Sequence, residues 1–447
     1  MQGNNRSVFS TLSPAQVLSL GYLTVILTGT ILLSLPFATV EAGGMAWLDA
    51  LFTATSATAV TGLIVENTST FFTLYGQIVI LILIQIGGLG LMTMSTLLAV
   101  IVGKKISLKQ RLVLQQDLDQ LNLSGVIDLV KYILAVTFVI EGSGALILFL
   151  RFWQDYPPLK ALYYGIFHSV SAFNNAGFDI FGNSLEAFTG DIVVNLVITT
   201  LIILGGIGFA VIAELYSGKL KFKNFSLQTK LVLSVTLILI VVAGMGVFML
   251  EYSNAATMEE LPLGEKALAS YFLAITPRTA GFNTVATGSL LNPTLFFIII
   301  LMFIGASPGS TGGGVKTTTV GIIFAVVYAT VTGKRDIEIF ERRIAKEVIC
   351  KSLAIITISL MLIFIVTIAL NVIEDMVFLD LLFEAVSAFG TVGLSTGVTG
   401  SLSEASKILI ILTMFAGRVG PLTLAIAVGE KEKQLNIRYP QEDVLVG

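Results

Sequence analysis

A glycine-rich interruption of a long apolar run constrains this sequence most. Residues 305–314 read Gly-Ala-Ser-Pro-Gly-Ser-Thr-Gly-Gly-Gly, and they separate the apolar stretches 294–304 and 320–332. Each stretch is too short to cross about 30 Å of hydrocarbon, whereas the two together exceed one crossing. Non-helical backbone survives at membrane depth only where protein covers it or water fills a cavity beside it. The interruption therefore predicts a broken membrane helix that lies along an aqueous path.

The composition places the whole chain in a membrane. Of the 447 residues, 55% are hydrophobic and 12% are charged, whereas about a quarter of the residues of a soluble protein are charged. The single Cys350 excludes an internal disulfide framework and a cysteine-ligated metal site. The single His168 leaves no histidine cluster. Enzyme classes that need such clusters are therefore disfavoured.

Long and short apolar segments alternate along the chain. Eight segments are long enough to span a membrane: 15–36, 76–102, 128–153, 190–217, 230–252, 294–332, 347–372 and 403–429. Within each consecutive pair lies a shorter segment that is typical of a re-entrant half-helix: 47–62, 159–177, 264–281 and 377–393. The predicted fold is an all-α polytopic membrane protein with four linked repeats of span, half-helix, loop and span around one central pore. Outside the third repeat, the second span is expected to be unbroken.

These segments predict the following divisions of the chain: a cytoplasmic N-terminus (1–14), repeat 1 (15–102), a cytoplasmic hairpin (103–127), repeat 2 (128–217), repeat 3 (230–332, broken at 305–314), repeat 4 (347–429) and a cytoplasmic C-terminal tail (430–447). The hairpin alternates charged residues and leucine in a helical pattern, which is typical of docking on a partner protein or on lipid headgroups. No predicted cytoplasmic segment is long enough for a nucleotide-binding domain.

The distribution of positive charge predicts the orientation. The termini and the segments between repeats hold 18 Lys and Arg residues, whereas the segments inside repeats hold five. By the positive-inside rule, both termini are cytoplasmic and the half-helices enter from outside the cell. The outer segments are rich in carboxylates, which would concentrate cations or would simply be a solvated surface. The sequence leaves that choice open.

The four loops that follow the half-helices share one pattern. Each contains a glycine after small or polar residues, and these glycines, Gly62, Gly177, Gly281 and Gly393, are 115, 104 and 112 residues apart. Such a period marks an internal repeat. Glycine tolerates positive φ, so successive carbonyls can turn to the same side of an extended strand. Four such strands would form rings of carbonyl oxygens that replace the hydration shell of a cation. The alternative is four turns that only reverse the half-helices.

The chemistry of the loops favours K⁺. No carboxylate lies within them, and neutral carbonyls suit a weakly hydrated monovalent cation better than a divalent ion. Half-helices that point inward would also direct their negative dipole ends at the ion. The predicted filter, with K⁺ held by backbone carbonyls, comprises Thr58, Ala59, Val60, Thr61, Gly62, Asn174, Asn175, Ala176, Gly177, Arg278, Thr279, Ala280, Gly281, Gly390, Thr391, Val392 and Gly393.

These loops, the break at 305–314 and Gly-Arg-Val-Gly-Pro at 417–421 resemble the superfamily of potassium transporters that includes the Trk, Ktr and HKT proteins. The resemblance covers nearly the whole chain and is strongest to the membrane subunits of bacterial Ktr uptake systems. It implies that the four glycines belong to a selectivity filter, and Gly62 is similar to the potassium-selective branch of the plant relatives. The second filter departs from the pattern, with Asn174 and Asn175 where threonines stand elsewhere.

Two cations lie within predicted spans, Lys316 and Arg418. A charge inside a span faces a pore or a partner, because burying it in lipid is costly. We expect Arg418 to donate hydrogen bonds to the broken segment and to repel ions until that segment moves, and the resemblance implies the same role. The alternative is a structural ion pair with Glu141, Glu214 or Glu384. Lys316 is expected to reach towards the cytoplasmic interface.

The predicted gate thus comprises the broken segment and both cations: Gly305, Ala306, Ser307, Pro308, Gly309, Ser310, Thr311, Gly312, Gly313, Gly314, Lys316 and Arg418. The predicted function is gated potassium uptake across the cell membrane, and a dependence on Na⁺ is left open. An ion-coupled secondary carrier for K⁺ or Na⁺ is the alternative; it more often shows inverted repeats and paired acidic residues at mid-depth. Only Glu141 and Glu214 could serve that purpose.

The resemblance also implies partners. These are a second copy of this chain, with one pore in each protomer, and a ring of cytosolic nucleotide-binding regulatory subunits, KtrA in the family's naming. The expected environment is membrane lipid, and no nucleic acid is expected to bind. No cofactor is expected on this chain, since nucleotide is implied only for the regulatory ring.

Overall fold

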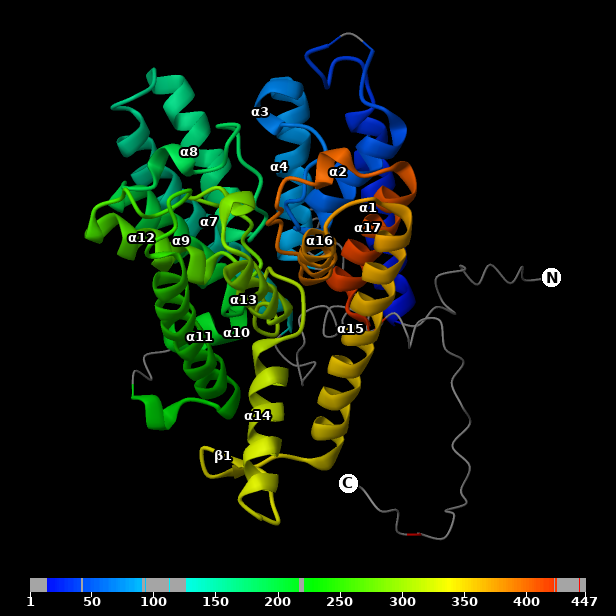
Figure 1. Ribbon diagram of the computed structural model, residues 1–447. Helices are drawn as coiled ribbons and strands as arrows, with labels where there is room; N and C mark the ends of the chain where they lie inside the picture. Colours follow the sequence, from blue (N-terminus) through cyan, green and yellow to red (C-terminus); the bar gives the residue numbers. More distant parts are fainter. Residues whose placement is uncertain are drawn as a thin grey trace, which may run out of the picture.

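The structure is a computed structural model, and it describes residues 14–41, 43–90, 126–216 and 221–421 together with the single residues Thr93, Leu112, Thr423 and Glu442. Apart from a few residues, the predicted cytoplasmic N-terminus (1–14), hairpin (103–127) and C-terminal tail (430–447) lie outside the described residues. The described chain is almost entirely helical, as Figure 1 shows. The prediction of an all-α membrane protein is confirmed.

Four long helices each precede a short one. The long helices are α1 (Pro14–Leu33), α7 (Val126–Phe152), α11 (Leu227–Glu251) and α15 (Lys346–Ile373). Each is long and apolar enough to cross a membrane. The short helices coincide with the predicted half-helices: α2 (Trp47–Ala59), α8 (Pro158–Phe173), α12 (Leu263–Ile275) and α16 (Phe378–Gly390).

After each short helix and its loop, a further helix runs back through the protein. These returning helices are α4 (Leu74–Leu89), the bent pair α9 (Ile192–Gly206) and α10 (Phe209–Tyr216), the broken pair α13 (Asn292–Phe303) and α14 (Thr317–Val331), and α17 (Glu404–Val419). Side-chain caps start several of them, because Thr73, Asp191 and Ser403 accept hydrogen bonds from the first turns of α4, α9 and α17.

The remaining described elements are small. They are α3 (Thr68–Phe71), the 3₁₀ turns η2 (Glu186–Phe188), η3 (Phe222–Asn224), η4 (Thr287–Ser289) and η5 (Thr399–Ser401), and a two-stranded antiparallel hairpin of β1 (Glu338–Ile339) and β2 (Arg342–Arg343). The hairpin joins α14 to α15, and these two helices extend below the rest of the molecule in Figure 1.

The returning helix is interrupted in the second repeat as well as in the third, so the expectation of an unbroken second span was wrong for repeat 2. Most residues that follow α4 and α17 lie outside the described part of the chain. Helix α9 meets α10 at an angle of 100°. Helices α4 and α17 end at Gly90 and Gly420, and Gly208 stands at the bend after α9; these three glycines have φ of +86°, +92° and +94°. Each closes a Gly-x-x-Gly sequence, at 87–90, 205–208 and 417–420. Among the described residues, the interruption between α13 and α14 is longer than the bend between α9 and α10.

Close packing explains the first glycine of each of these sequences. A Cβ atom on Gly87, Gly205 or Gly417 would overlap a carbonyl near the end of the short helix in the same repeat, at Thr58, Phe173 and Phe389 respectively. Because a backbone carbonyl cannot rotate away, only glycine lets the returning helix lie against the end of the short helix.

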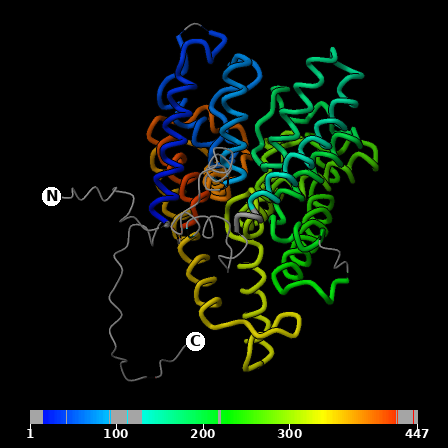
Figure 2. The backbone as a smooth tube through the Cα atoms, turned by 180° about the vertical axis from the view of Figure 1, so that it is seen from behind, coloured from blue at the N-terminus to red at the C-terminus, as the bar shows by residue number. Residues whose placement is uncertain are grey.

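The repeats pack in a closed ring. Each returning helix contacts the short helix of the next repeat, in the pairs α4 with α8, α9 with α12, α13 with α16, and α17 with α2. The last pair joins the two ends of the described chain. Figures 1 and 2 show the consequence: the blue and orange helices of the first and fourth repeats lie together, opposite the cyan and green helices of the second and third.

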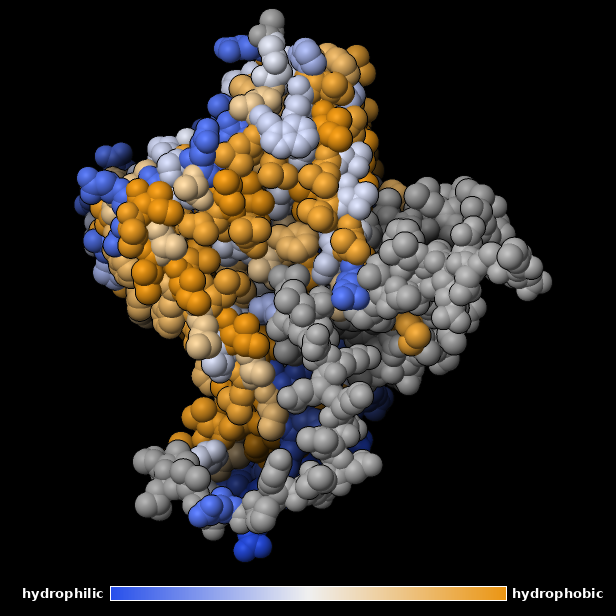
Figure 3. Space-filling model, turned by 90° about the vertical axis from the view of Figure 1, so that its right-hand side faces the viewer, coloured by the Kyte–Doolittle hydropathy of each residue, from blue (hydrophilic) through white to orange (hydrophobic). Residues whose placement is uncertain are grey.

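The outer surface of the long helices is apolar. Val139, Met249 and Val372 are 71%, 75% and 80% exposed. Figure 3 shows hydrophobic residues over most of one face, with hydrophilic residues gathered at its upper and lower ends. A soluble protein rarely exposes contiguous apolar patches of this extent, whereas a bilayer accepts them. The chain is therefore a multi-pass membrane protein.

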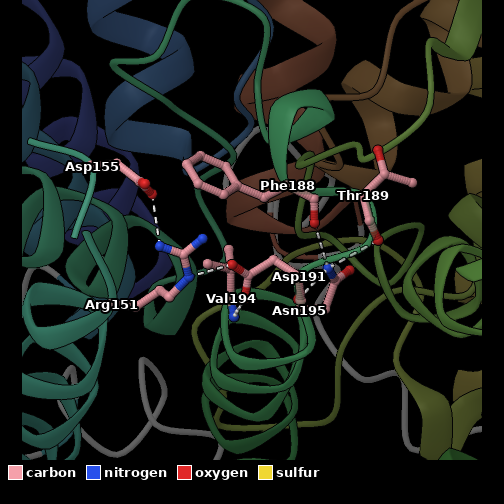
Figure 4. Close-up of polar contacts among 7 residues, drawn as sticks. All are labelled: Arg151, Asp155, Phe188, Thr189, Asp191, Val194 and Asn195. Carbon is pink, nitrogen blue, oxygen red and sulfur yellow. Dashed lines mark hydrogen bonds and ion pairs between the residues drawn. The ribbon is translucent and has the colours of Figure 1, made fainter. Parts of the chain in front are cut away.

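Ion pairs neutralise basic residues at the upper end of the molecule. Arg151 Nε lies 2.5 Å from Asp191 and its Nη1 lies 2.7 Å from Asp155, as Figure 4 shows. Asp191 also caps α9, and Asn195 one turn later donates to the carbonyl of Phe188. In the same way, Lys407 pairs with Asp49 at 2.6 Å and joins the fourth repeat to the first. These contacts fix helix ends.

Candidate functional site

Each filter loop begins with a residue in the left-handed conformation. These residues are Val60, Asn175, Thr279 and Thr391, with φ of 58°, 58°, 67° and 50°, and we call them the inner ring. Each precedes its filter glycine by two positions. Left-handed backbone costs a β-branched residue roughly 1–2 kcal/mol. Its recurrence at four equivalent positions shows that the fold imposes one backbone path on all four loops.

The four predicted filter glycines meet in a closed ring. A Cβ atom on Gly62 would touch Gly177, one on Gly177 would touch Gly281, one on Gly281 would touch Gly393, and one on Gly393 would touch Gly62. All four glycines have positive φ, between +71° and +92°. The atoms in contact are backbone atoms, so no side chain fits between the loops. Residues from all four repeats thus surround one axis, although they are more than 100 positions apart in sequence.

One hydroxyl in each short helix holds the loop that follows it. Ser56 and Ser387 each accept a hydrogen bond of 3.1 Å from the N–H group of Gly62 and Gly393. Ser171 donates to the carbonyl of Phe178 at 2.7 Å. Thr276 donates to the carbonyl of Phe282 at 2.5 Å. The sequence placed small hydroxyl residues at these helix ends but did not predict that they clamp the loops.

A vestibule opens above the glycine ring. A cavity of about 390 Å³ is lined by all four filter glycines together with Asp179 and Glu186. A neighbouring cavity of about 270 Å³ adds Glu66. Among the described residues that line these cavities, no Lys or Arg occurs. The negative charge at this mouth would raise the local concentration of cations.

Neutralising Glu66 tests this electrostatic role. We expect Glu66→Gln to lower the initial rate of cation uptake about twofold at low ionic strength, and we expect the difference to vanish in about 0.5 M of an impermeant salt, because salt screens exposed charges. The matched control is Glu259→Gln, which lies outside both vestibule cavities. Equal losses in the two variants, or a loss that persists in high salt, would contradict the role.

The segment between α13 and α14 lies directly below the glycine ring. It folds back on itself, with Gly305 N–H donating to the carbonyl of Val315 at 2.9 Å. It is anchored on the break of the second repeat, because the N–H groups of Ser307 and Thr311 donate to the carbonyls of Gly206 and Gly205 at 2.9 and 3.2 Å. The interrupted helices thus satisfy each other's free backbone groups, as buried polar backbone requires.

Arg418 connects this segment to the first repeat. Its guanidinium donates to the carbonyl of Thr311 in the segment, to the carbonyl of Gly87 and, at 3.4 Å, to that of Gly88. The carboxylates considered as alternative partners bond elsewhere: Glu141 to Gln85 and Asn174, Glu214 to Ser226 and Thr229, and Glu384 to Thr399. Arg418 thus bonds to backbone carbonyls of the segment and of the first repeat and to none of these carboxylates.

Lys316 takes a position other than the expected one. Its amino group donates to the carbonyl of Gly312 at 2.8 Å, inside the interrupted segment, instead of reaching towards the cytoplasmic interface. The carbonyl of Gly312, four residues earlier, lies within reach of the flexible lysine side chain. A cavity of about 290 Å³ lies below the segment and is lined by Lys316, Lys351 and Arg418. The segment therefore separates an acidic upper cavity from a basic lower one.

The second filter differs because its amides serve protein contacts. Asn174 Nδ2 donates to Glu141 at 2.9 Å and to Gln85 at 3.0 Å. Asn175 Nδ2 donates to Thr279 Oγ1 at 3.2 Å and to the carbonyl of Arg278 at 3.3 Å. Sequence reasoning marked Asn174 and Asn175 as a departure but missed Gln85 as a partner. The signal that could have found this contact was Glu141, because a carboxylate inside an apolar span needs polar partners.

The comparison with protein families agrees with this geometry. The family model TrkH, described as "Cation transport protein", matches residues 16–437. This chain belongs to the TrkH family. The resemblance to the Trk, Ktr and HKT superfamily is thereby confirmed. The family consists of transport proteins, so the prediction that the chain is not an enzyme is also confirmed.

Characterised relatives cover nearly the full chain. It is 47% identical to Ktr system potassium uptake protein B of Bacillus subtilis, over 97% of both chains. It is 37% identical to the potassium/sodium uptake protein NtpJ of Enterococcus hirae, over 99% of both. The crystal structure of the potassium transporter TrkH from Vibrio parahaemolyticus has a TM-score of 0.70 at 18% identity and covers 92% of this chain and 85% of that one. That likeness shows the fold.

Proposed function

We propose that this chain carries K⁺ into the cell through the glycine ring. The observation that supports this most is the closed ring of Gly62, Gly177, Gly281 and Gly393 between two cavities. The names of the relatives, potassium uptake and potassium/sodium uptake proteins, agree with it. In this proposal the acidic vestibule faces outward, and both termini and the α14–α15 extension are cytoplasmic, as the positive-inside rule predicts.

Backbone carbonyls provide the selectivity. The carbonyls of Thr61, Ala176, Ala280 and Val392 directly precede the filter glycines, and each lies close to the glycine of a neighbouring repeat. In the proposed mechanism they replace the water around K⁺ as it enters. The interaction with neutral carbonyl dipoles offsets the free energy of removing water from K⁺, but not the much larger cost of removing water from a divalent ion. The short helices direct their C-terminal ends at the space below and favour cations there.

The segment at 305–314 acts as the gate in this proposal. It lies below the filter, bonded to the second repeat and held by Arg418. The positive charge of Arg418 and Lys316 repels a cation that leaves the filter, so conduction requires the segment to move. The carrier alternative is less well supported, since Glu141 is fully engaged with Gln85 and Asn174 inside the protein.

Regulation in this proposal comes from separate subunits. The 47% identical relative from Bacillus subtilis is named as part of a Ktr system, which supports a multi-component assembly. In this proposal the assembly is a homodimer of this chain on a cytosolic nucleotide-binding ring, KtrA in the family's naming. Nucleotide would then bind the ring, and this chain would carry only the transported ion.

Flux into reconstituted vesicles tests the function. We expect the purified chain to take up ⁸⁶Rb⁺ down an imposed K⁺ gradient, with external K⁺ competing at least about tenfold better than Na⁺. The measurement is repeated with and without Na⁺ outside and with and without the regulatory subunit. Deleting residues 309–314 should raise the flux. Vesicles whose ⁸⁶Rb⁺ uptake equals that of protein-free vesicles under all these conditions would refute the proposal.

A further inference from the structure

We infer that the inner ring is the docking site of the closed gate and that Asn175 transmits the position of the gate to the filter. This inference rests on the proposed filter and gate. It concerns the side chains of the residues that begin the filter loops, whereas ion binding in the filter uses backbone carbonyls. The argument starts from the contacts between the inner ring and residues 311–313.

Three members of the inner ring face the gate segment. Thr391 Oγ1 accepts a hydrogen bond of 3.1 Å from the N–H group of Gly313. Asn175 Oδ1 accepts one of 3.3 Å from Thr311 Oγ1. Thr279 Oγ1 lies so close to Gly312 that a Cβ atom on that glycine would overlap it. Three consecutive residues of the segment thus meet the second, third and fourth filters in turn.

The fourth member, Val60, cannot form a hydrogen bond through its side chain. Its Cγ2 packs against Gly87, where it would lie 3.0 Å from an added Cβ atom. The carbonyl of Gly87 accepts a hydrogen bond from Arg418, which also holds Thr311. The gate is therefore held by hydrogen bonds at the second and fourth filters, lies against Thr279 at the third, and is held by Arg418 on the side of the first. The inner ring is thus polar at three positions and apolar at the fourth, as expected if one segment from a single repeat docks under a ring formed by four repeats.

Asn175 is suited to transmission because its amide has both a donor and an acceptor. The acceptor faces the gate at Thr311, and the donor reaches Thr279 Oγ1 and the carbonyl of Arg278 in the third filter. The side chain of Asn175 is fully buried. When Thr311 withdraws, Oδ1 loses its donor, and a buried amide without its partner reorients to recover one. The third filter then loses the bond that ties it to the second.

A thiol probe on the gate tests the docking. Cys350 is the only cysteine of the chain, so Cys350→Ser gives a background without thiols. Ser310→Cys then places a probe on the wall of the lower cavity. The test variants in this background are Asn175→Leu and Thr391→Val, and both keep the approximate side-chain size. The matched control is Thr367→Val, a buried threonine of α15 whose hydroxyl has no hydrogen-bond partner among the described residues.

Both test variants should expose the probe. In vesicles, we expect a charged thiol reagent on the cytoplasmic side to react about fivefold faster in Asn175→Leu and Thr391→Val, with a parallel rise in ⁸⁶Rb⁺ flux. Thr367→Val should match the background. Only Asn175→Leu should also lower the preference for Rb⁺ over Na⁺, because it alone removes the bond to the third filter. Size-exclusion profiles show whether each variant is folded. If Asn175→Leu is not folded, the labelling rate of Thr391→Val, the more conservative change, tests the docking by itself.

The possible failures are distinguishable. Labelling rates equal to the background in both test variants would overturn the docking. An Asn175→Leu variant with faster labelling and unchanged ion preference would overturn the transmission alone. Deleting residues 309–314 serves as the reference: if the deletion raises flux while the inner-ring variants do not, the gate stands and this inference fails. If the deletion leaves flux unchanged, the proposed gate itself fails.

Discussion

Replacing Gly281 with alanine is expected to abolish selective K⁺ uptake without unfolding the protein. The added Cβ atom would lie 2.6 Å from the carbonyl oxygen of Val392 and 3.0 Å from the Cα atom of Gly177. These are backbone atoms, so no side-chain rotation relieves the contact. The positive φ of +75° adds roughly 1–2 kcal/mol of strain. The loops must move apart, and the Val392 carbonyl is displaced from the ring.

The measurement is the rate of ⁸⁶Rb⁺ uptake into vesicles. We expect this rate to be at least about tenfold lower for Gly281→Ala, which corresponds to a change of about 1.4 kcal/mol in the free energy of one step. Gly264→Ala is the matched control, since Gly264 lies in the first turn of α12 with no atom near its potential Cβ position. It should transport like the unmodified chain. Retention of both rate and ion preference in Gly281→Ala would remove the glycine ring from the proposed mechanism.

Replacing Arg418 with glutamine is expected to raise the flux. Arg418 donates to the carbonyl of Thr311 in the segment and to that of Gly87 in α4, and glutamine is too short and uncharged to do the same. A hydrogen bond to a charged group contributes about 1.5–3 kcal/mol. Losing the bond to Thr311 should shift the gate towards its open position and increase ⁸⁶Rb⁺ uptake by about tenfold or more.

A lysine at the same position separates the two roles of Arg418. Arg418→Lys keeps the positive charge but lacks the planar fork that reaches two carbonyls at once. If the latch dominates, Arg418→Lys should approach the flux of Arg418→Gln. If charge repulsion dominates, it should stay near the unmodified chain. Unchanged flux in both variants would show that Arg418 does not hold the gate.

Periodicity in the sequence predicted much of the fold. The short helices α2, α8, α12 and α16 lie where half-apolar segments of about a dozen residues were found, because a segment of that length cannot cross a bilayer. The four glycines were found from their spacing alone. The bend at Gly208 was missed, because a hydropathy window averages over a single kink in an apolar run.

Several partners in the site could not have been predicted from the sequence. Lys316 bonds to Gly312 four residues away, and the choice between that carbonyl and the interface depends on how the segment folds. Asn174 meets Gln85 and Glu141 across more than 30 residues of sequence in each case. A single sequence holds no information on which polar groups of different repeats meet, since many pairings satisfy the same composition.

The sequence by itself determined that this chain is a fourfold repeated membrane protein with a broken helix, because bilayer thickness and the glycine requirement act on local segments. Only the tertiary structure decided that the returning helix of the second repeat also bends, that the glycines close into one ring, and that residues 305–314 lie beneath it. The physical reason is that these contacts join different repeats that are far apart in the sequence, such as Gly313 and Thr391, which are 78 residues apart. Their hydrogen bonds form only after the repeats have packed into a ring.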